Sequence, residues 1–186
     1  ITERTPLLMS AGAGPNGIDF LYSNVRVGND YEAHLRFLMN VKDPDMDVDY
    51  LFLETYAVFS EKVCKALMAG MPIKNLQLVK AVIYENDKEY TGFSIARISK
   101  ILQSFDEGKS TYKKINRQGS WVGIKKIVME KTLLTQIPLE ERLVFKAKED
   151  TGLKLYHESV VDIIKSVAPK GLRFIPVEEW SRTMTF

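Results

Sequence analysis

The chain has 186 residues, of which 45% are hydrophobic and 27% charged, with a net charge of +2 and one cysteine. At this length about 70% of the unfolded chain's surface can be buried, which suffices for one domain with its own core. A single cysteine excludes an internal disulfide and a cysteine-rich zinc site. The longest apolar runs fall short of the ~18 residues that a membrane-spanning helix needs, and the chain opens without a signal-like segment, so we expect an intracellular, cytoplasmic protein.

Charge is distributed unevenly along the chain. Residues 1–60 carry four basic and nine acidic side chains, a net charge of −5, so the remainder carries +7. Such an asymmetry indicates a surface for a charged partner.

The first 30 residues read as a flexible arm, followed by a core domain over 31–186. Residues 10–17 (SAGAGPNG) offer little to pack and tolerate positive φ at several positions. Within the arm, Glu3, Leu7 and Leu8 match the spacing of an acidic-dileucine sorting signal. The alternative is an apolar attachment of the arm to the core.

The next segment predicts a strand, a helix and a second strand. Alternation over 35–41 favours a strand with one buried face. Apolar residues recur at helical spacing over 48–67, with Asp47 as the N-cap and Gly70 and Pro72 after the last turn. Residues 76–84 are apolar on both alternations, as in a central strand. This β-α-β order predicts a parallel or mixed pair of strands.

The second half predicts further mixed structure. A polar turn at 85–88 precedes a helix expected from Thr91 to Phe105, and strands are expected at 121–134 and 143–148. A turn at 150–152 leads to a helix over 156–167, and 172–186 is expected to be extended. The fold class is therefore α+β, a single mixed-sheet domain with about three helices.

Residues suited to catalysis are few, and we predict that the protein is not an enzyme. His34 lies on the polar side of a strand, His157 opens a helix, and Cys64 is expected as a buried thiol in the middle of a helix. Residues 12–17 begin with G-x-G but lack the strand and helix of a phosphate loop. We therefore expect no cofactor and no small-molecule substrate.

An acidic stretch resembles an EF-hand calcium loop in its spacing. Its carboxylates occupy positions 1, 3, 5, 7 and 12 of that loop: Asp43, Asp45, Asp47, Asp49 and Glu54. Position 6 is Val48, where the loop needs glycine, so we expect a helix-capping turn and no metal site.

The densest positive charge lies in residues 109–131, called the basic segment below, whose net charge is +6. It contributes our candidate binding residues: Lys109, Lys113, Lys114, Arg117, Trp121, Lys125, Lys126 and Lys131. Basic side chains with interleaved exposed aromatics bind phosphate backbones and stack on bases, and they also attract anionic membranes or acidic proteins. A solvated strand edge is the remaining alternative.

The order of elements resembles that of rhabdovirus matrix proteins. The features that carry the resemblance are the arm, the strand-helix-strand over 34–84, the basic middle, and the closing helix and extended segment over 156–186. A proline-rich motif typical of the arm in several members is absent, since Pro6 and Pro15 are isolated. The resemblance implies self-association, peripheral contact with the inner face of a membrane, nucleocapsid binding and a place in a virion.

Three hypotheses follow. The first is a structural, matrix-like protein that oligomerises and binds anionic membrane through the basic segment. The second is an RNA-binding module that uses Lys113, Lys114, Arg117 and Trp121. The third is an intracellular protein-interaction adaptor whose basic strand pairs with an acidic or extended partner.

Overall fold

The computed structural model describes residues 7–10, 28, 31–37, 46–53, 56–115, 117 and 119–180. Its strands are β1 (Leu7–Ser10), β2 (Glu32–Phe37), β3 (Tyr50–Leu53), β4 (Tyr56–Ser60), β5 (Leu76–Glu85), β6 (Lys88–Ile98), β7 (Ile101–Leu102), β8 (Lys114–Ile115), β9 (Trp121–Val122), β10 (Val144–Ala147) and β11 (Lys154–Tyr156). Its helices are α1 (Glu61–Ala69), α2 (Lys131–Thr135) and α3 (Glu158–Lys165), with short 3-10 turns η2 (Leu139–Glu141) and η3 (Val177–Glu179).

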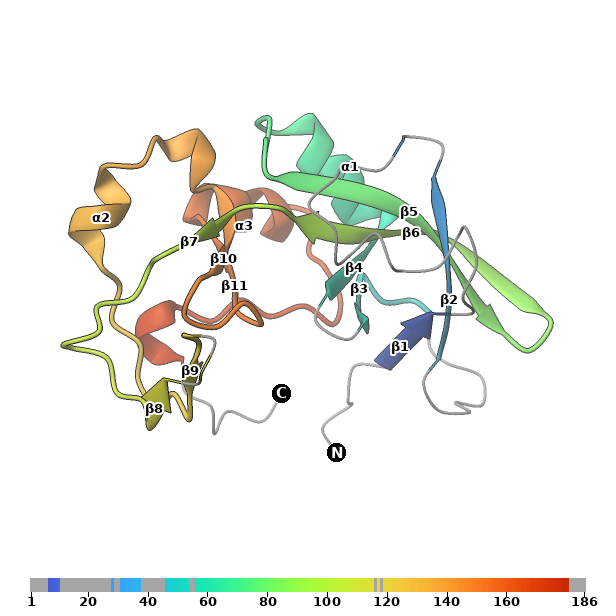
Figure 1. Ribbon diagram of the computed structural model, residues 1–186. Helices are drawn as coiled ribbons and strands as arrows, with labels where there is room; N and C mark the ends of the chain where they lie inside the picture. The colour runs from blue at the N-terminus through green and yellow to red at the C-terminus, as the bar shows by residue number, and fades with distance from the viewer. Residues whose placement is uncertain are drawn as a thin grey trace.

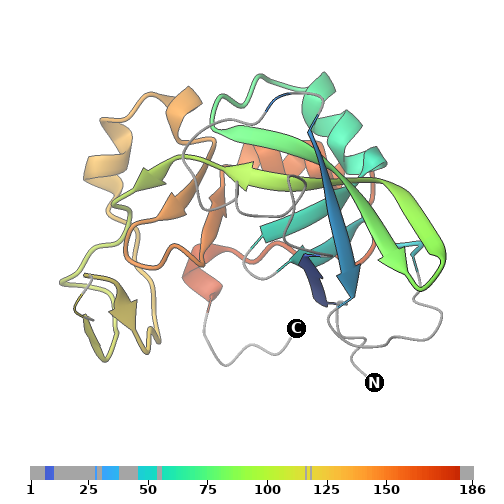
Figure 2. The same ribbon diagram turned by 45° about the vertical axis from the view of Figure 1, so that its right-hand side comes forward.

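Six strands close into a barrel in the order β1-β2-β5-β6-β4-β3 (Figure 1). Two of the neighbouring pairs, β2 with β5 and β1 with β3, are parallel, and the others are antiparallel. The β5–β6 hairpin is long enough to project beyond the barrel (Figure 2). The predicted parallel pair is confirmed, because β2 and β5 lie side by side and α1 falls between them in sequence.

The interior of the barrel is filled by alternate residues of its strands, as the two-residue period of a strand requires. Eleven buried residues form this cluster: Ala33, Leu35, Leu51, Leu53, Tyr56, Val58, Val79, Ala81, Ile83, Phe93 and Ile95.

The helix expected over 48–67 is wrong in its first half. Residues 50–53 and 56–60 form the antiparallel pair β3–β4, and the helix begins only after Ser60, whose hydroxyl accepts the N–H of Val63. Aromatic and β-branched residues crowd this stretch, so its apolar positions fit a buried strand as well as a helix. From Ser60 onward the prediction is confirmed, and the N–H of Gly70 closes the helix on Ala66.

The helix expected from Thr91 to Phe105 is also wrong, because the chain turns back as β6 against β5. Glu85 pairs with Lys88 across a two-residue turn, and Asn86 there has φ +51°. Asparagine tolerates the left-handed region that such tight turns require. The predicted turn is thus confirmed, but it joins two strands.

Helices α1 and α3 pack on one another beside the barrel and cover a second cluster of buried residues. The predicted third helix is confirmed with shorter bounds, and His157 caps it by accepting the N–H of Ser159. The two helices approach closely at Gly70, where an added Cβ would lie 2.6 Å from Cδ1 of Ile163.

A separate three-stranded sheet, in the order β11-β10-β7, lies beside the barrel (Figure 1). Its central strand confirms the strand predicted at 143–148, and the Asp150 carbonyl accepts the N–H of Leu153 in the predicted turn. The long strand expected at 121–134 is wrong, because that stretch contains only β9, irregular chain and α2. The segment expected to be extended at 172–186 contains the turn η3, and 181–186 lie outside the described residues.

The α+β class and the mixed sheet are confirmed. Residues 7–10, expected in the arm, form β1 and pair with both β2 and β3, so Leu7 and Leu8 belong to the barrel. Glu3 and most of the proposed arm lie outside the described residues. Within the part of the chain that the structure describes, no helix is both long and apolar enough to cross a membrane.

Candidate binding surface

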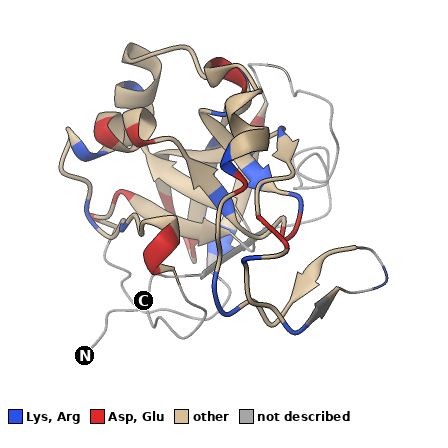
Figure 3. Ribbon diagram, turned by 90° about the vertical axis from the view of Figure 1, so that its left-hand side faces the viewer, with Lys and Arg blue, Asp and Glu red and all other residues tan. Residues whose placement is uncertain are grey.

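The basic segment folds back on itself and projects away from the barrel (Figures 1 and 3). At its tip β8 and β9 pair, with Ile115 opposite Trp121, and the N–H of Lys113 donates to the Val122 carbonyl at 2.9 Å. Nearer the base, the Thr111 carbonyl accepts the N–H of Lys125 at 2.7 Å. The segment is therefore an irregular hairpin with its own backbone hydrogen bonds.

Trp121 packs the hairpin against a cluster of buried residues that includes Ala147 of β10. Its ring stacks on Tyr112 at 4.1 Å between centroids and tilts against Phe105 at 5.8 Å. Ile124 and Ile127 are buried in the same cluster. Trp121 is only 7% exposed, so our expectation of an exposed aromatic at this position is wrong. An aromatic residue in a basic stretch is placed by the hydrophobic effect, which the surrounding charges do not override.

Glu149 fixes the base of the hairpin, a role that sequence reasoning missed. Its Oε1 accepts the N–H groups of Ser104 at 2.9 Å and Phe105 at 3.0 Å, and its Oε2 accepts the Ser104 hydroxyl at 3.2 Å. Its carbonyl accepts the N–H of Trp121 at 2.7 Å. The side chain is buried, and its three hydrogen bonds offset the cost of removing the carboxylate from water.

One of the predicted binding residues is paired within the chain. Lys109 Nζ lies 2.7 Å from the Asp106 carboxylate, and the hydrogen bond raises the pKa of Lys109 and lowers that of Asp106. Nearby, the Tyr112 hydroxyl donates to Glu107 at 2.8 Å, which raises the Tyr112 pKa. Lys109 is thus the least suited of the predicted set to bind a partner's anion.

Five other cations of the basic segment face solvent. Those whose side chains are described and exposed are Lys113, Arg117, Lys125, Lys126 and Lys131. Within the described residues, Lys109–Asp106 is the only ion pair of this segment. The backbone of Lys114 lies in β8, whereas its side chain lies outside the described set. Among these charges Ile115 is 44% exposed, so an apolar side chain lies within the basic surface.

The histidines and the cysteine have structural contacts. Nδ1 of His34 lies 2.7 Å from the Tyr84 hydroxyl, and the two rings stack. His157 is the cap of α3. Cys64 is buried, and this burial raises the pKa of its thiol to about 11, so little thiolate forms at neutral pH.

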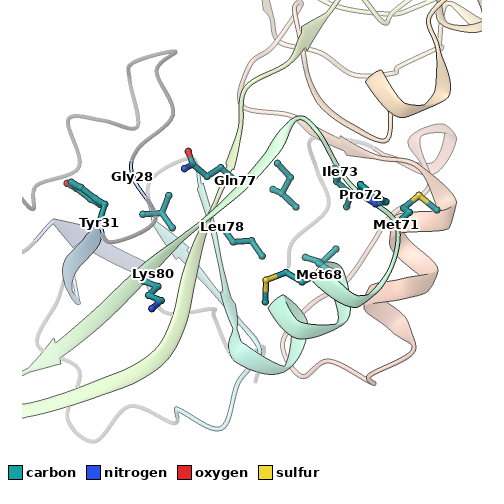
Figure 4. A pocket seen from close by; sticks show the side chains of 12 residues that line it. Gly28, Tyr31, Met68, Met71, Pro72, Ile73, Gln77, Leu78 and Lys80 are labelled. Atoms are coloured by element: carbon teal, nitrogen blue, oxygen red, sulfur yellow. The ribbon is translucent and has the colours of Figure 1, made fainter.

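A groove of about 320 Å³ runs between the end of α1 and the part of β5 that β2 leaves unpaired (Figure 4). Met68, which is 70% exposed, and Met71 lie on the helical side, and Leu78 and Lys80 lie on the strand side (Figure 4). Its lining includes neither histidine, and its only titratable groups among the described residues are Tyr31 and Lys80.

The acidic stretch is only partly described, since Asp43, Asp45 and Glu54 lie outside the described residues. The N-cap of α1 is Ser60 and not one of these carboxylates, so the expected helix-capping turn is wrong; Asp49 instead accepts the hydroxyl of Ser60 and lies 2.6 Å from Lys62 Nζ. Burial raises the pKa of Asp49, but hydrogen bonds from Lys62, Ser60 and Lys170 outweigh burial and lower it. Across the described residues, no group of three His, Cys, Asp or Glu side chains is arranged to hold a metal ion.

Comparison with known proteins identifies no relative: no protein-family model matches the chain, and neither does any curated protein. The resemblance to rhabdovirus matrix proteins therefore stays a prediction.

Proposed function

We propose that the protein is an interaction module that binds an acidic surface of a partner protein through the basic segment. The observation that carries the proposal is the arrangement of this hairpin: its exposed cations other than Lys109 make no ion pair among the described residues, Ile115 is 44% exposed, and Trp121 is buried against Tyr112. Protein interfaces combine an apolar centre with a charged rim that complements the partner's charge.

The burial of Trp121 distinguishes among the possible partners. Binding of single-stranded RNA relies on aromatic faces open to bases, and peripheral membrane binding gains from tryptophan at the headgroup level. Trp121 packs between Tyr112 and Phe105, so its ring is available neither for stacking on a base nor for insertion at the headgroup level. An acidic protein requires only the cations and Ile115, both of which the hairpin exposes.

The backbone of the hairpin supports a contact with an extended partner chain. Strand β9 is engaged on both sides, by β8 and by the Trp121 N–H to Glu149 hydrogen bond. Within the described residues, β8 pairs with β9 alone, so its outer edge is open to another strand. Lysine side chains along such an edge discourage pairing with like-charged chains and favour acidic ones.

The test measures binding of three fluorescent probes at physiological salt: a short peptide rich in Glu and Leu, a single-stranded RNA, and vesicles containing phosphatidylserine. We expect the peptide to bind, and the double substitution Lys125→Glu with Lys126→Glu to weaken it by about tenfold or more, since each exposed ionic contact contributes about 0.5–1 kcal/mol. The matched control is Lys165→Glu with Arg173→Glu, which reverses two exposed cations outside the basic segment.

Other results of this experiment would indicate a different partner or no specific site. Stronger binding of RNA or of vesicles, lost in the Lys125 and Lys126 variant, would replace the acidic protein by that partner and favour the RNA-binding or the matrix-like hypothesis. Equal loss in both double variants would show that binding depends on net charge alone and would overturn the proposal. Replacement of Ile115 by Ser separates the apolar contribution, because it changes no charge.

A further inference from the structure

Strand β5 has an open edge beside the groove at the end of α1. Strand β6 pairs with β5 over residues 76–85, whereas β2 pairs with it only over residues 80–84. Among the described residues, the stretch 76–79 of β5 therefore has a neighbouring strand on one side only. An open edge presents backbone N–H and C=O groups with which another strand can pair.

The hydrogen bonds of the β5–β6 pair show which residues present these groups. The N–H of Ser99 donates to the Asn75 carbonyl at 3.0 Å, at the position just before the paired residues of β5. Because hydrogen-bonded and non-hydrogen-bonded positions alternate in an antiparallel pair, Leu76 and Leu78 direct their backbone groups away from β6. The N–H of Leu76 is bonded to the Ile73 carbonyl at 3.1 Å. The open edge therefore offers the N–H and C=O of Leu78 and the C=O of Leu76.

The groove follows the outer face of β5. Side chains alternate between the two faces of a strand, so Leu76, Leu78 and Lys80 share one face, while Val79 lies in the cluster that fills the barrel. All three residues of the outer face line the groove. The facing wall includes Met68 at the end of α1, which is 70% exposed. Methionine is flexible and polarisable and adapts to differently shaped apolar groups.

Charge is confined to one end of the groove. Among the described lining residues Lys80 is the charged one, and its side chain is exposed. Lys80 lies toward Tyr31, whereas Ile73 and Met71 lie at the opposite end (Figure 4). Glu32 stands opposite Lys80 in the β2–β5 register, but no ion pair joins them within the described part of the chain. The groove thus complements a ligand that is apolar over most of its length and negative at one end.

We propose that this groove binds an extended segment of a partner protein, which pairs with the open edge of β5. In this mode of recognition the backbone hydrogen bonds give affinity, and alternate side chains of the added strand enter pockets that give specificity. Apolar side chains of the segment lie between β5 and Met68, and a carboxylate of the segment lies at Lys80. A fatty acid would use the apolar wall and Lys80, but it would leave the backbone groups of Leu78 unused. The site contains no residue of the basic segment, so it is independent of the proposed function.

The experiment measures binding of a fluorescent peptide of alternating Val and Thr that ends in Asp, at physiological salt. We expect saturable binding that Met68→Glu weakens by about tenfold through the lost apolar contact, and that Lys80→Glu weakens by about fivefold. A peptide that ends in Lys should in turn bind Lys80→Glu better than the wild type. The matched controls are Leu133→Glu, at an apolar residue that is 40% exposed outside the groove, and Lys165→Glu.

Two N-methylated peptides test the pairing of backbones. An added strand turns every second N–H toward β5, so methylation of one alternate set of amides should abolish binding and methylation of the other set should leave it. Equal binding of the parent and both methylated peptides, or competition by decanoate at equal strength, would indicate an apolar pocket without strand pairing and would overturn the proposal.

Failure of this proposal is distinguishable from failure of the proposed function. The double substitution Lys125→Glu with Lys126→Glu should leave binding of the Val and Thr peptide unchanged, and loss of binding in that variant would place the peptide on the basic segment and overturn the proposal. Absence of saturable binding to the wild type would overturn it too. Folding of each variant is checked by circular dichroism, and Met68→Gln replaces Met68→Glu if the latter fails to fold.

Discussion

Removing the carboxylate of Glu149 should loosen the basic hairpin before the rest of the protein unfolds. In Glu149→Gln the remaining carbonyl can still accept the N–H groups of Ser104 and Phe105, and the new amide can donate to the Ser104 hydroxyl. Glu149→Gln therefore removes only the charge, and we expect the free energy of unfolding to fall by about 1–2 kcal/mol, because hydrogen bonds to ionised groups are stronger than neutral ones by about that amount. In Glu149→Ala two buried N–H groups lose their partner at about 1–3 kcal/mol each, about 2–6 kcal/mol in total.

The assay is urea unfolding followed by two signals. Circular dichroism reports the whole protein, and fluorescence reports Trp121 when Trp180, the second tryptophan, is replaced by Phe. We expect Glu149→Ala to shift Trp121 emission to the red at lower urea than the circular dichroism transition. Glu140→Ala, at an exposed glutamate of η2, is the control. Coincident transitions and wild-type stability in Glu149→Ala would refute the role of this carboxylate.

Three further predictions concern local features. Gly119 has φ +80° and open space around it, so Gly119→Ala should lower the free energy of unfolding in urea by about 1 kcal/mol. Gly123 has φ +61°, and a carbon of the Lys113 side chain would lie 2.6 Å from the new Cβ, so Gly123→Ala should lower it by more. Equal losses in the two variants would contradict the crowding at Gly123. Cys64, with its pKa raised to about 11, should react with a thiol reagent at neutral pH only as fast as the protein opens, and rapid labelling of the native protein would contradict its burial. Lys154 has a folded pKa of about 8, below its unfolded value, so its charge destabilises the fold below pH 8 and this cost disappears as pH rises toward 10.5. At pH 7, Lys154→Met should therefore raise the free energy of unfolding by about 1–2 kcal/mol after allowance for solvent screening, and a gain that persists at high pH would contradict this explanation.

The sequence predicts the α+β class, the parallel strand pair and two of the helices, but it misassigns two stretches where apolar residues are dense. In both, the apolar positions fit a helical stripe and a strand buried on one face. Two local signals favoured strands in the second stretch: Asn86 in a two-residue turn and Gly92, which has φ +82°. The barrel itself depends on pairing between distant segments, such as β1 with β3, which no local pattern reveals.

The sequence predicts the charges of the basic segment, but it does not predict how the segment folds. Clustered lysines are visible in any sequence, and the described ones except Lys109 do face solvent unpaired. That Trp121 is buried depends on Phe105 and Tyr112, and that Glu149 holds the hairpin depends on a contact with Ser104, 45 positions away. Lys146 and Lys154 likewise face one another only once β10 and β11 pair.

Binding of an acidic partner to the basic segment can be tested by mapping where an acidic peptide binds on the intact protein. Amide chemical shifts of isotope-labelled protein are followed while the Glu- and Leu-rich peptide is added at physiological salt. We expect saturable shifts concentrated over residues 109–131, strongest around Ile115, and absent in the Lys125 and Lys126 double variant. Shifts centred on the groove beside Met68, or spread evenly over all exposed cations, would contradict it.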